Sequence, residues 1–298
     1  MNTKHRNAAA AVVTGVLLCG TAACSGGGSS DHAGKPAASS TTAQKPVEVS
    51  PLAAVRQAAD NSRKITSLTY TMHGSIPGSG TVDADASMSM KPLAMRMLTK
   101  TSGAADPQEN GDMEIRLTGS GLYIGGASLA AQSGGKKWIK FPTSALGEGA
   151  KGGQDPLAGL GSQASGNPAD ESTSLTASKD LKKVGNETVD GVSTTHYSGT
   201  VTLDALRKES AGKGADAKKR AERTIKAYQD MGLTKLTMDM WIDGSDHTKQ
   251  FRTRGTAAKG PLDMMIKFVN INKPVTVRTP PAAETMDLAQ MMEGSGSA

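Results

Sequence analysis

Residues 81–97, TVDADASMSMKPLAMRM, decide the fold class of this chain because apolar and polar side chains alternate along them. Apolar residues occupy every second position from Val82 to Met90, and Asp and Ser fill the positions between. After a turn at Lys91-Pro92 the alternation resumes and continues to Met97. A period of two predicts β-strands with one buried and one solvated face, joined here as antiparallel neighbours.

Further strands are predicted on both sides of this stretch, at 68–76, 113–118, 122–124, 137–141, 186–189, 192–203, 236–242, 247–256, 262–268 and 274–277, of which 247–256 is largely polar. Asp190-Gly191 is a typical two-residue hairpin turn. Helical periodicity appears over 50–64, where Ser50-Pro51 forms a good start, and over 204–231, with a break at Gly212–Gly214. The chain is therefore predicted to be α+β, with one large antiparallel sheet that closes on itself or curls around two or three helices.

The N-terminus resembles a bacterial lipoprotein signal. A basic head precedes the apolar stretch Ala8–Gly20, which is too short to span a bilayer. Small residues at 21–23 precede Cys24, the arrangement that a lipoprotein signal peptidase cleaves, although Thr21 stands where such signals prefer Leu. We predict a signal peptide over 1–23 and lipidation of Cys24. A plain secretory signal cleaved after residue 23 is the alternative.

The cysteines and the following segment agree with an anchored protein. Cys19 lies in the predicted signal peptide, so the mature chain has one cysteine and no internal disulfide. More than one acyl chain on Cys24 gives stable membrane anchoring. Residues 24–49 are rich in Gly, Ser, Ala, Thr and Pro, which predicts a flexible tether. The net charge of +6 is dispersed, which favours a solvated surface or anionic headgroups over nucleic acid.

No motif for catalysis, a metal or a cofactor occurs in the sequence. Nucleophile-elbow and P-loop patterns are missing, and no two histidines have the spacing of metal ligands. We interpret His73 and His196 as solvent-facing, and Asp83 with Asp85 as the wet side of a strand. We therefore predict a protein that is not an enzyme and has no cofactor. The basic helical stretch at 207–226 is either a solvated helix face or an element at a membrane surface.

Methionine replaces aromatic residues as the bulky apolar side chain. The chain has 15 Met but only 3 Phe, 4 Tyr and 2 Trp. Methionine is flexible and polarizable, so strand faces lined with it suit apolar partners of variable shape, such as acyl chains. The alternative is a methionine-rich filled core. The predicted lining of a lipid cavity consists of Met72, Met88, Met90, Met95, Met97, Ile115, Leu117, Met238, Met240, Met264 and Ile266.

The C-terminal half resembles the actinobacterial lipoproteins of the LppX/LprG type. The resemblance rests on the hairpin at 189–201, the following charged helix, the strand MDMWID at 238–243 and the segment KPVTV at 273–277 before Pro280-Pro281. It implies a LolA/LolB-like half-open β-barrel with helices packed in its concavity. It also implies an apolar cavity that carries acylated lipids or lipoglycans.

These observations predict four regions. They are a signal peptide (1–23), a lipidated Cys with a tether (24–49), a lipid-binding domain (50–292) with a flexible insert at 143–177, and a disordered tail (293–298). We expect a protein on the extracytoplasmic face of the cell membrane. One hypothesis is a lipid carrier; the other is an envelope sensor or scaffold with a filled core that acts through protein partners.

Overall fold

The computed structural model describes residues 49–126, 130, 135–142, 168–212 and 214–289. All of them belong to one compact unit, Glu48–Ala298. The predicted signal peptide, Cys24, nearly all of the tether, most of the 143–177 insert and the tail lie outside the described residues.

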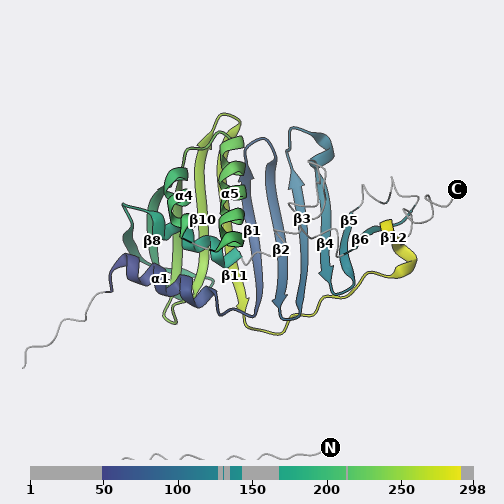
Figure 1. Cartoon of the computed structure of the whole chain (residues 1–298), viewed down its shortest axis with the longest axis horizontal. Helices are drawn as coiled ribbons and strands as arrows, with labels where there is room; N and C mark the ends of the chain where they lie inside the picture. Colours follow the sequence, from purple (N-terminus) through teal and green to yellow (C-terminus); the bar gives the residue numbers. More distant parts are fainter. Residues whose placement is uncertain (1–48, 127–129, 131–134, 143–167, 213, 290–298) are drawn as a thin grey trace, which may run out of the picture. The chain divides into compact units, whose positions relative to one another are not determined.

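One twelve-stranded sheet forms the framework of this unit (Figure 1). The strand order is β12-β6-β5-β4-β3-β2-β1-β11-β10-β9-β8-β7, and every neighbouring pair is antiparallel except β12 with β6. The strands are β1 (Ser67–Ile76), β2 (Gly80–Met90), β3 (Leu93–Ser102), β4 (Gly111–Thr118), β5 (Gly121–Gly126), β6 (Trp138–Phe141), β7 (Lys182–Val189), β8 (Val192–Thr202), β9 (Lys235–Asp243), β10 (Thr248–Ala257), β11 (Gly260–Ile271) and β12 (Thr285–Asp287).

The sheet consists of two meanders, β1–β6 and β7–β11, which join where β1 pairs with β11. Within each meander, strands that follow one another in the chain are neighbours. The predicted hairpin at Asp190-Gly191 is confirmed, because both residues have positive φ angles, 48° and 81°, as a tight two-residue turn requires. The prediction of a large, open antiparallel sheet is therefore confirmed.

The helices of the described residues are α1 (Pro51–Ser62), η1 (Pro107–Glu109), η3 (Pro168–Ala177), α4 (Leu203–Ala211), α5 (Ala215–Asp230) and η4 (Ala282–Glu284). The Ser50 hydroxyl accepts a hydrogen bond from the Ala53 amide and caps α1, and Pro51 occupies its first position, as predicted. The predicted break in the second helical stretch separates α4 from α5. In Figure 1, α1, α4 and α5 lie over the half of the sheet that contains β8–β11.

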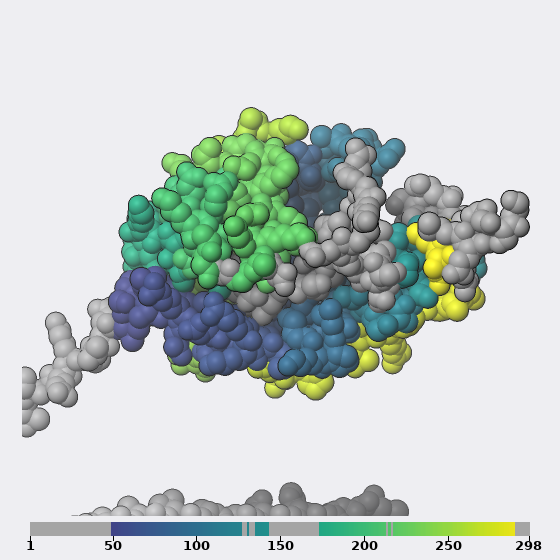
Figure 2. Space-filling model, in the orientation of Figure 1, coloured from purple at the N-terminus to yellow at the C-terminus, as the bar shows by residue number. Residues whose placement is uncertain are grey.

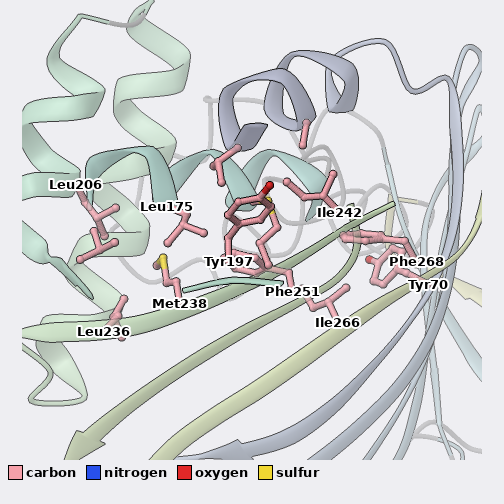
Figure 3. Packing of buried hydrophobic residues seen from close by; sticks show 14 of the residues in the cluster. Tyr70, Leu175, Tyr197, Leu206, Leu236, Met238, Ile242, Phe251, Ile266 and Phe268 are labelled. Atoms are coloured by element: carbon pink, nitrogen blue, oxygen red, sulfur yellow. The ribbon is translucent and has the colours of Figure 1, made fainter. Parts of the chain in front are cut away.

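The main hydrophobic core lies between these helices and the sheet (Figure 3). Leu175 of η3 and Leu206 of α4 pack with Tyr197, Met238 and Phe251 of the strands. The apolar period of two along each strand places these side chains on the face that the helices cover. This half of the predicted architecture, a sheet with helices on its inner side, is therefore present.

The prediction of a flexible insert at 143–177 is wrong for its last ten residues, 168–177. Pro168–Ala177 forms the 3-10 helix η3, and Leu175 has no exposed surface. A single leucine among polar and small residues has no periodicity, so the sequence does not reveal this anchor.

The predicted closing strand at 274–277 is also wrong. This segment pairs with no strand, and the chain instead reaches β6 at Thr285–Asp287, where β12 pairs in parallel. The Lys137 amide donates to the Glu284 carbonyl and fixes the start of this strand.

Replacing Leu175 by Ala is expected to lower the free energy of unfolding by about 2–5 kcal/mol, because a fully buried leucine leaves a cavity. Urea denaturation followed by circular dichroism measures this change. Ser174→Ala is the matched control, since Ser174 is a half-buried neighbour in the same helix. An unchanged midpoint for Leu175→Ala would contradict the anchoring role of η3.

Candidate functional site

All eleven residues of the predicted lining lie on one face of the sheet, here called the inner face. The strand register aligns Met240, Phe251, Ile266 and Met72 in one row across β9, β10, β11 and β1. A second row runs across β2 to β6 and contains Met88, Met95, Leu117, Leu122 and Phe141. The period of two in each strand places the remaining members on the same side.

These eleven residues divide between two apolar clusters. The helix-covered cluster contains Met238, Met240 and Ile266, with Met72 and Met264 at its margin. The strand cluster contains Met88, Met95, Ile115 and Leu117, with Met90 at its margin. Met97 packs against both clusters and links them. The inner face is therefore a continuous apolar surface across both meanders.

Burial differs between members of the set. Seven residues are buried: Met88, Met95, Ile115, Leu117, Met238, Met240 and Ile266. The other four, Met72, Met90, Met97 and Met264, are half-buried. Each apolar side chain named in the strand cluster comes from β2–β6, and none comes from a described helix.

Two surface pockets, of about 350 and 260 Å³, lie near the turn between β10 and β11. Their linings meet at Pro261 and include Lys259 in the larger pocket and Arg254 in the smaller. Neither pocket is lined by a residue of the predicted set. The half-buried methionines are thus the accessible part of that set.

The opposite, outer face carries a polar cluster around His196 on β8. Nδ1 of His196 lies 2.8 Å from Oε1 of Glu187, and Nε2 lies 3.0 Å from Oδ1 of Asp239. The imidazole ring stacks on Trp241 at a centroid distance of 4.2 Å. The indole N–H donates to the second oxygen of Glu187 at 2.8 Å, and Arg254 donates to the second oxygen of Asp239 at 2.5 Å. These contacts join β7, β8, β9 and β10.

The charges of this cluster are arranged to favour ionised carboxylates. Burial alone would raise the pKa of Asp239, but hydrogen bonds from Arg254, Ser198 and His196 outweigh it and lower the pKa below 3.8. Hydrogen bonds from Trp241 and His196 lower the pKa of Glu187. Because carboxylates only accept, both contacts of His196 are satisfied together only when each ring nitrogen carries a hydrogen.

The sequence-based interpretation of His196 is therefore wrong, whereas that of His73 is confirmed. The His196 side chain is 12% exposed and lies between two carboxylates, but the His73 side chain is 71% exposed. The outer position of His196 followed from its strand phase. Its partners were not predicted: the register set by the Asp190-Gly191 turn pairs Gly185 with His196 and brings Glu187 within reach, and Asp239 comes from β9.

The outer-face cluster ties four neighbouring strands together through its side-chain contacts. No group of three or more His, Cys, Asp or Glu side chains able to hold a metal ion occurs in the described part of the chain. None of the helices placed by the structure combines the length and apolar character needed to cross a bilayer. The extended apolar surface of the inner face is the candidate for ligand binding that the predicted lining residues form.

The architecture is an open, mostly antiparallel sheet whose inner face packs against the helices. No family model matches the chain. It is 30% identical over 210 residues to an uncharacterised 31.2 kDa protein of Streptomyces griseus encoded between rplA and rplJ, covering 66% of this chain and 64% of that one. It is 27% identical over 187 residues to a candidate lipoprotein of Streptomyces coelicolor, SCO4650, covering 62% and 54%. The chain thus spans less than two thirds of the length of either relative.

Among solved structures, the chain is similar to the lipoprotein LppX of Mycobacterium tuberculosis, with 18% identity and a TM-score of 0.43 over 76% of this chain and 98% of that one. It is also similar to LprF of Mycobacterium bovis, with 14% identity and a TM-score of 0.47 over 77% and 96%. The resemblance to LppX/LprG-type lipoproteins that the sequence motifs carry is found again in these comparisons.

Proposed function

We propose that this chain is an extracytoplasmic lipoprotein, anchored to the cell membrane through Cys24, whose inner face binds or carries acylated lipids or lipoglycans. In this proposal it is not an enzyme, and its ligand leaves chemically unchanged. The proposal is supported by the lipoprotein signal in the sequence, by the candidate lipoprotein among its relatives and by the apolar inner face.

The observation that carries the proposal is the strand cluster with its half-buried methionines. It extends the apolar surface of the helix-covered core onto β2–β6, and no described helix contributes a side chain to it. Acyl chains packed on this surface gain about 0.8 kcal/mol for each methylene withdrawn from water. The flexible thioethers of Met90 and Met97 adapt to chains of different length and saturation.

A second candidate function is a scaffold or sensor that acts through protein partners. The observation that favours it is the burial of seven of the eleven predicted lining residues, together with their absence from both surface pockets. In that case the methionines form a filled core and no lipid is bound.

Met90→Asp is expected to weaken lipid binding at least about tenfold. Burial of the apolar Met90 side chain against a lipid contributes about 1.5–3 kcal/mol to binding, and a carboxylate at this position loses that contribution. Ser87→Asp is the matched control, since it adds the same charge to the same strand on the outer face. The full chain with Cys24→Ser, produced in a Streptomyces host, is analysed by native mass spectrometry with lipid extraction. Titration with a fluorescent fatty acid measures the affinity of both variants.

A stoichiometric bound lipid that is lost in Met90→Asp and kept in Ser87→Asp supports the carrier. A protein that is isolated empty and ignores added fatty acids and phospholipids supports the scaffold. Equal losses of lipid affinity in the two variants would show that the inner face of β2 is not part of the binding surface.

A further inference from the structure

We infer that the exposed side of α5 docks the domain onto an anionic bilayer surface by electrostatic attraction. The inference deepens the proposed function and rests on it in one respect, that an anchored carrier works beside a membrane. Ile225 is the one residue of α5 that is fully buried among those whose side chains are described, and Ala221 and Tyr228 are half-buried on the same side. The rest of the helix is available for contact.

The opposite side of α5 is basic. Lys219, Arg223 and Lys226 follow one another at i, i+4 and i+7, so they share the side that lies away from Ile225, and all three are exposed. Arg220 flanks this row and is exposed, and Lys218, on the side of Ile225, is exposed too. Figure 2 shows α4 and α5, in green, along the face turned toward the viewer.

The two acidic side chains of α5 that the structure describes, Glu222 and Asp230, do not neutralise this surface. Lys226 pairs with Asp230 at 2.8 Å, but both side chains are more than half exposed, and Lys218 is 4.0 Å from Glu222. Exposed pairs of this kind contribute little and exchange readily for other anions. Arg220 and Arg223 form no ion pair with any residue that the structure describes. Lipid phosphates can therefore bind the exposed guanidinium groups of Arg220 and Arg223 and the exposed ammonium group of Lys226.

A bilayer fits this surface better than a protein groove or a nucleic acid. The basic side has no large apolar residue, so it cannot fill a hydrophobic groove or insert deeply, and it suits a plane of anionic headgroups. The proposed anchor at Cys24 would hold the domain beside the bilayer. The effective concentration of bilayer surface would then be high, so even weak attraction suffices.

Docking by α5 would bring the inner face to the membrane. In Figure 1, α5 lies over the junction where β11 meets β1, and Ile225 belongs to the helix-covered cluster. Met97 links that cluster to the strand cluster. A lipid that leaves the bilayer beside α5 therefore meets the apolar surface at its middle.

The test uses the full chain carrying Cys24→Ser, so that no acyl anchor contributes, with vesicles of phosphatidylcholine alone or mixed with phosphatidylglycerol. Co-sedimentation is measured for the parent and for the triple variant Lys219→Glu, Arg223→Glu, Lys226→Glu. The control variant Lys64→Glu, Lys91→Glu, Lys259→Glu makes the same change of net charge at three exposed turn positions. Circular dichroism verifies that each variant keeps its helix content.

The parent is expected to bind only the vesicles that contain phosphatidylglycerol. The affinity of the α5 variant for these vesicles is expected to fall about 100-fold or more, because each basic residue removed lowers it about fivefold. The affinity of the control variant is expected to fall far less. Binding by the parent should also fall as salt is raised from about 0.1 to about 1 M, because the screening length shortens from about 10 to about 3 Å.

Equal binding by the α5 variant and the control, or equal binding to neutral and anionic vesicles, would overturn the docking surface. The proposed function is judged separately by the fatty-acid titration. An α5 variant that keeps fatty-acid affinity but loses vesicles supports the inference. A parent that ignores fatty acids yet binds anionic vesicles through α5 overturns the carrier and leaves the docking surface intact.

Discussion

A chain carrying Met240→Asp is expected to be unfolded under conditions in which the parent is folded. Met240 has no exposed surface and packs at the centre of the helix-covered cluster with Tyr197 and Phe251. Burying a carboxylate there without a partner costs more than about 4 kcal/mol, a large part of the roughly 5–15 kcal/mol that typically separates folded from unfolded domains. Thermal unfolding followed by near-ultraviolet circular dichroism measures the effect.

Met240→Leu is the control, because it preserves volume and apolar character and is expected to cost less than about 1.5 kcal/mol. A Met240→Asp protein with the parent's melting temperature would place this side chain outside the core. The result also decides which methionines report on lipid binding. Loss of binding in a Met240 variant would reflect unfolding, whereas half-buried Met90 separates the two effects.

Asp239→Ala is expected to lower the free energy of unfolding by about 3 kcal/mol at neutral pH, the lower end of the cost of breaking a buried pair. The Asp239 side chain is 3% exposed and accepts hydrogen bonds from His196 and Arg254, so its removal leaves both donors without their partner. The lower end applies because Arg254 remains partly hydrated. Urea denaturation at several pH values measures the loss.

The difference between parent and Asp239→Ala should shrink in acid. The folded-state pKa of Asp239 is lowered from 3.8, so its contribution is complete above that pH and is lost as pH falls through the folded-state pKa. Asp239→Asn keeps the shape and one acceptor, and should be destabilised less at neutral pH. A difference that stays constant from neutral pH down to well below 3.8 would contradict the ionic role of this carboxylate.

Much of the fold could be predicted because its strands alternate regularly. The period of two from Val82 to Met97 gave the correct inner and outer faces, and Asp190-Gly191 gave the correct turn. All eleven predicted lining residues lie on the inner face for the same reason. Their predicted role in a lipid cavity stays a prediction, because strand phase determines the side of the sheet and says nothing about what covers that side.

The features that sequence reasoning missed depend on contacts between distant segments. Leu175 is isolated in the sequence and becomes a core residue through packing against strands that follow it in the chain. His196 acquires Asp239, 43 residues later in the chain, through the pairing of β8 with β9. The parallel pairing of β12 with β6 joins the C-terminal segment to a strand from the first half of the chain. No local pattern encodes these encounters.

The pairing of β1 with β11 has a consequence for the order in which the molecule is assembled. Synthesis proceeds from the N-terminus, so β1–β6 can form a meander while β1 still has one unpaired edge. The strand that covers this edge, β11, is nearly the last to be made. An exposed edge beside an apolar face invites pairing with other chains, so the interval before β11 arrives is the period of greatest aggregation risk. The junction at the middle of the finished sheet is among the last parts of it to form.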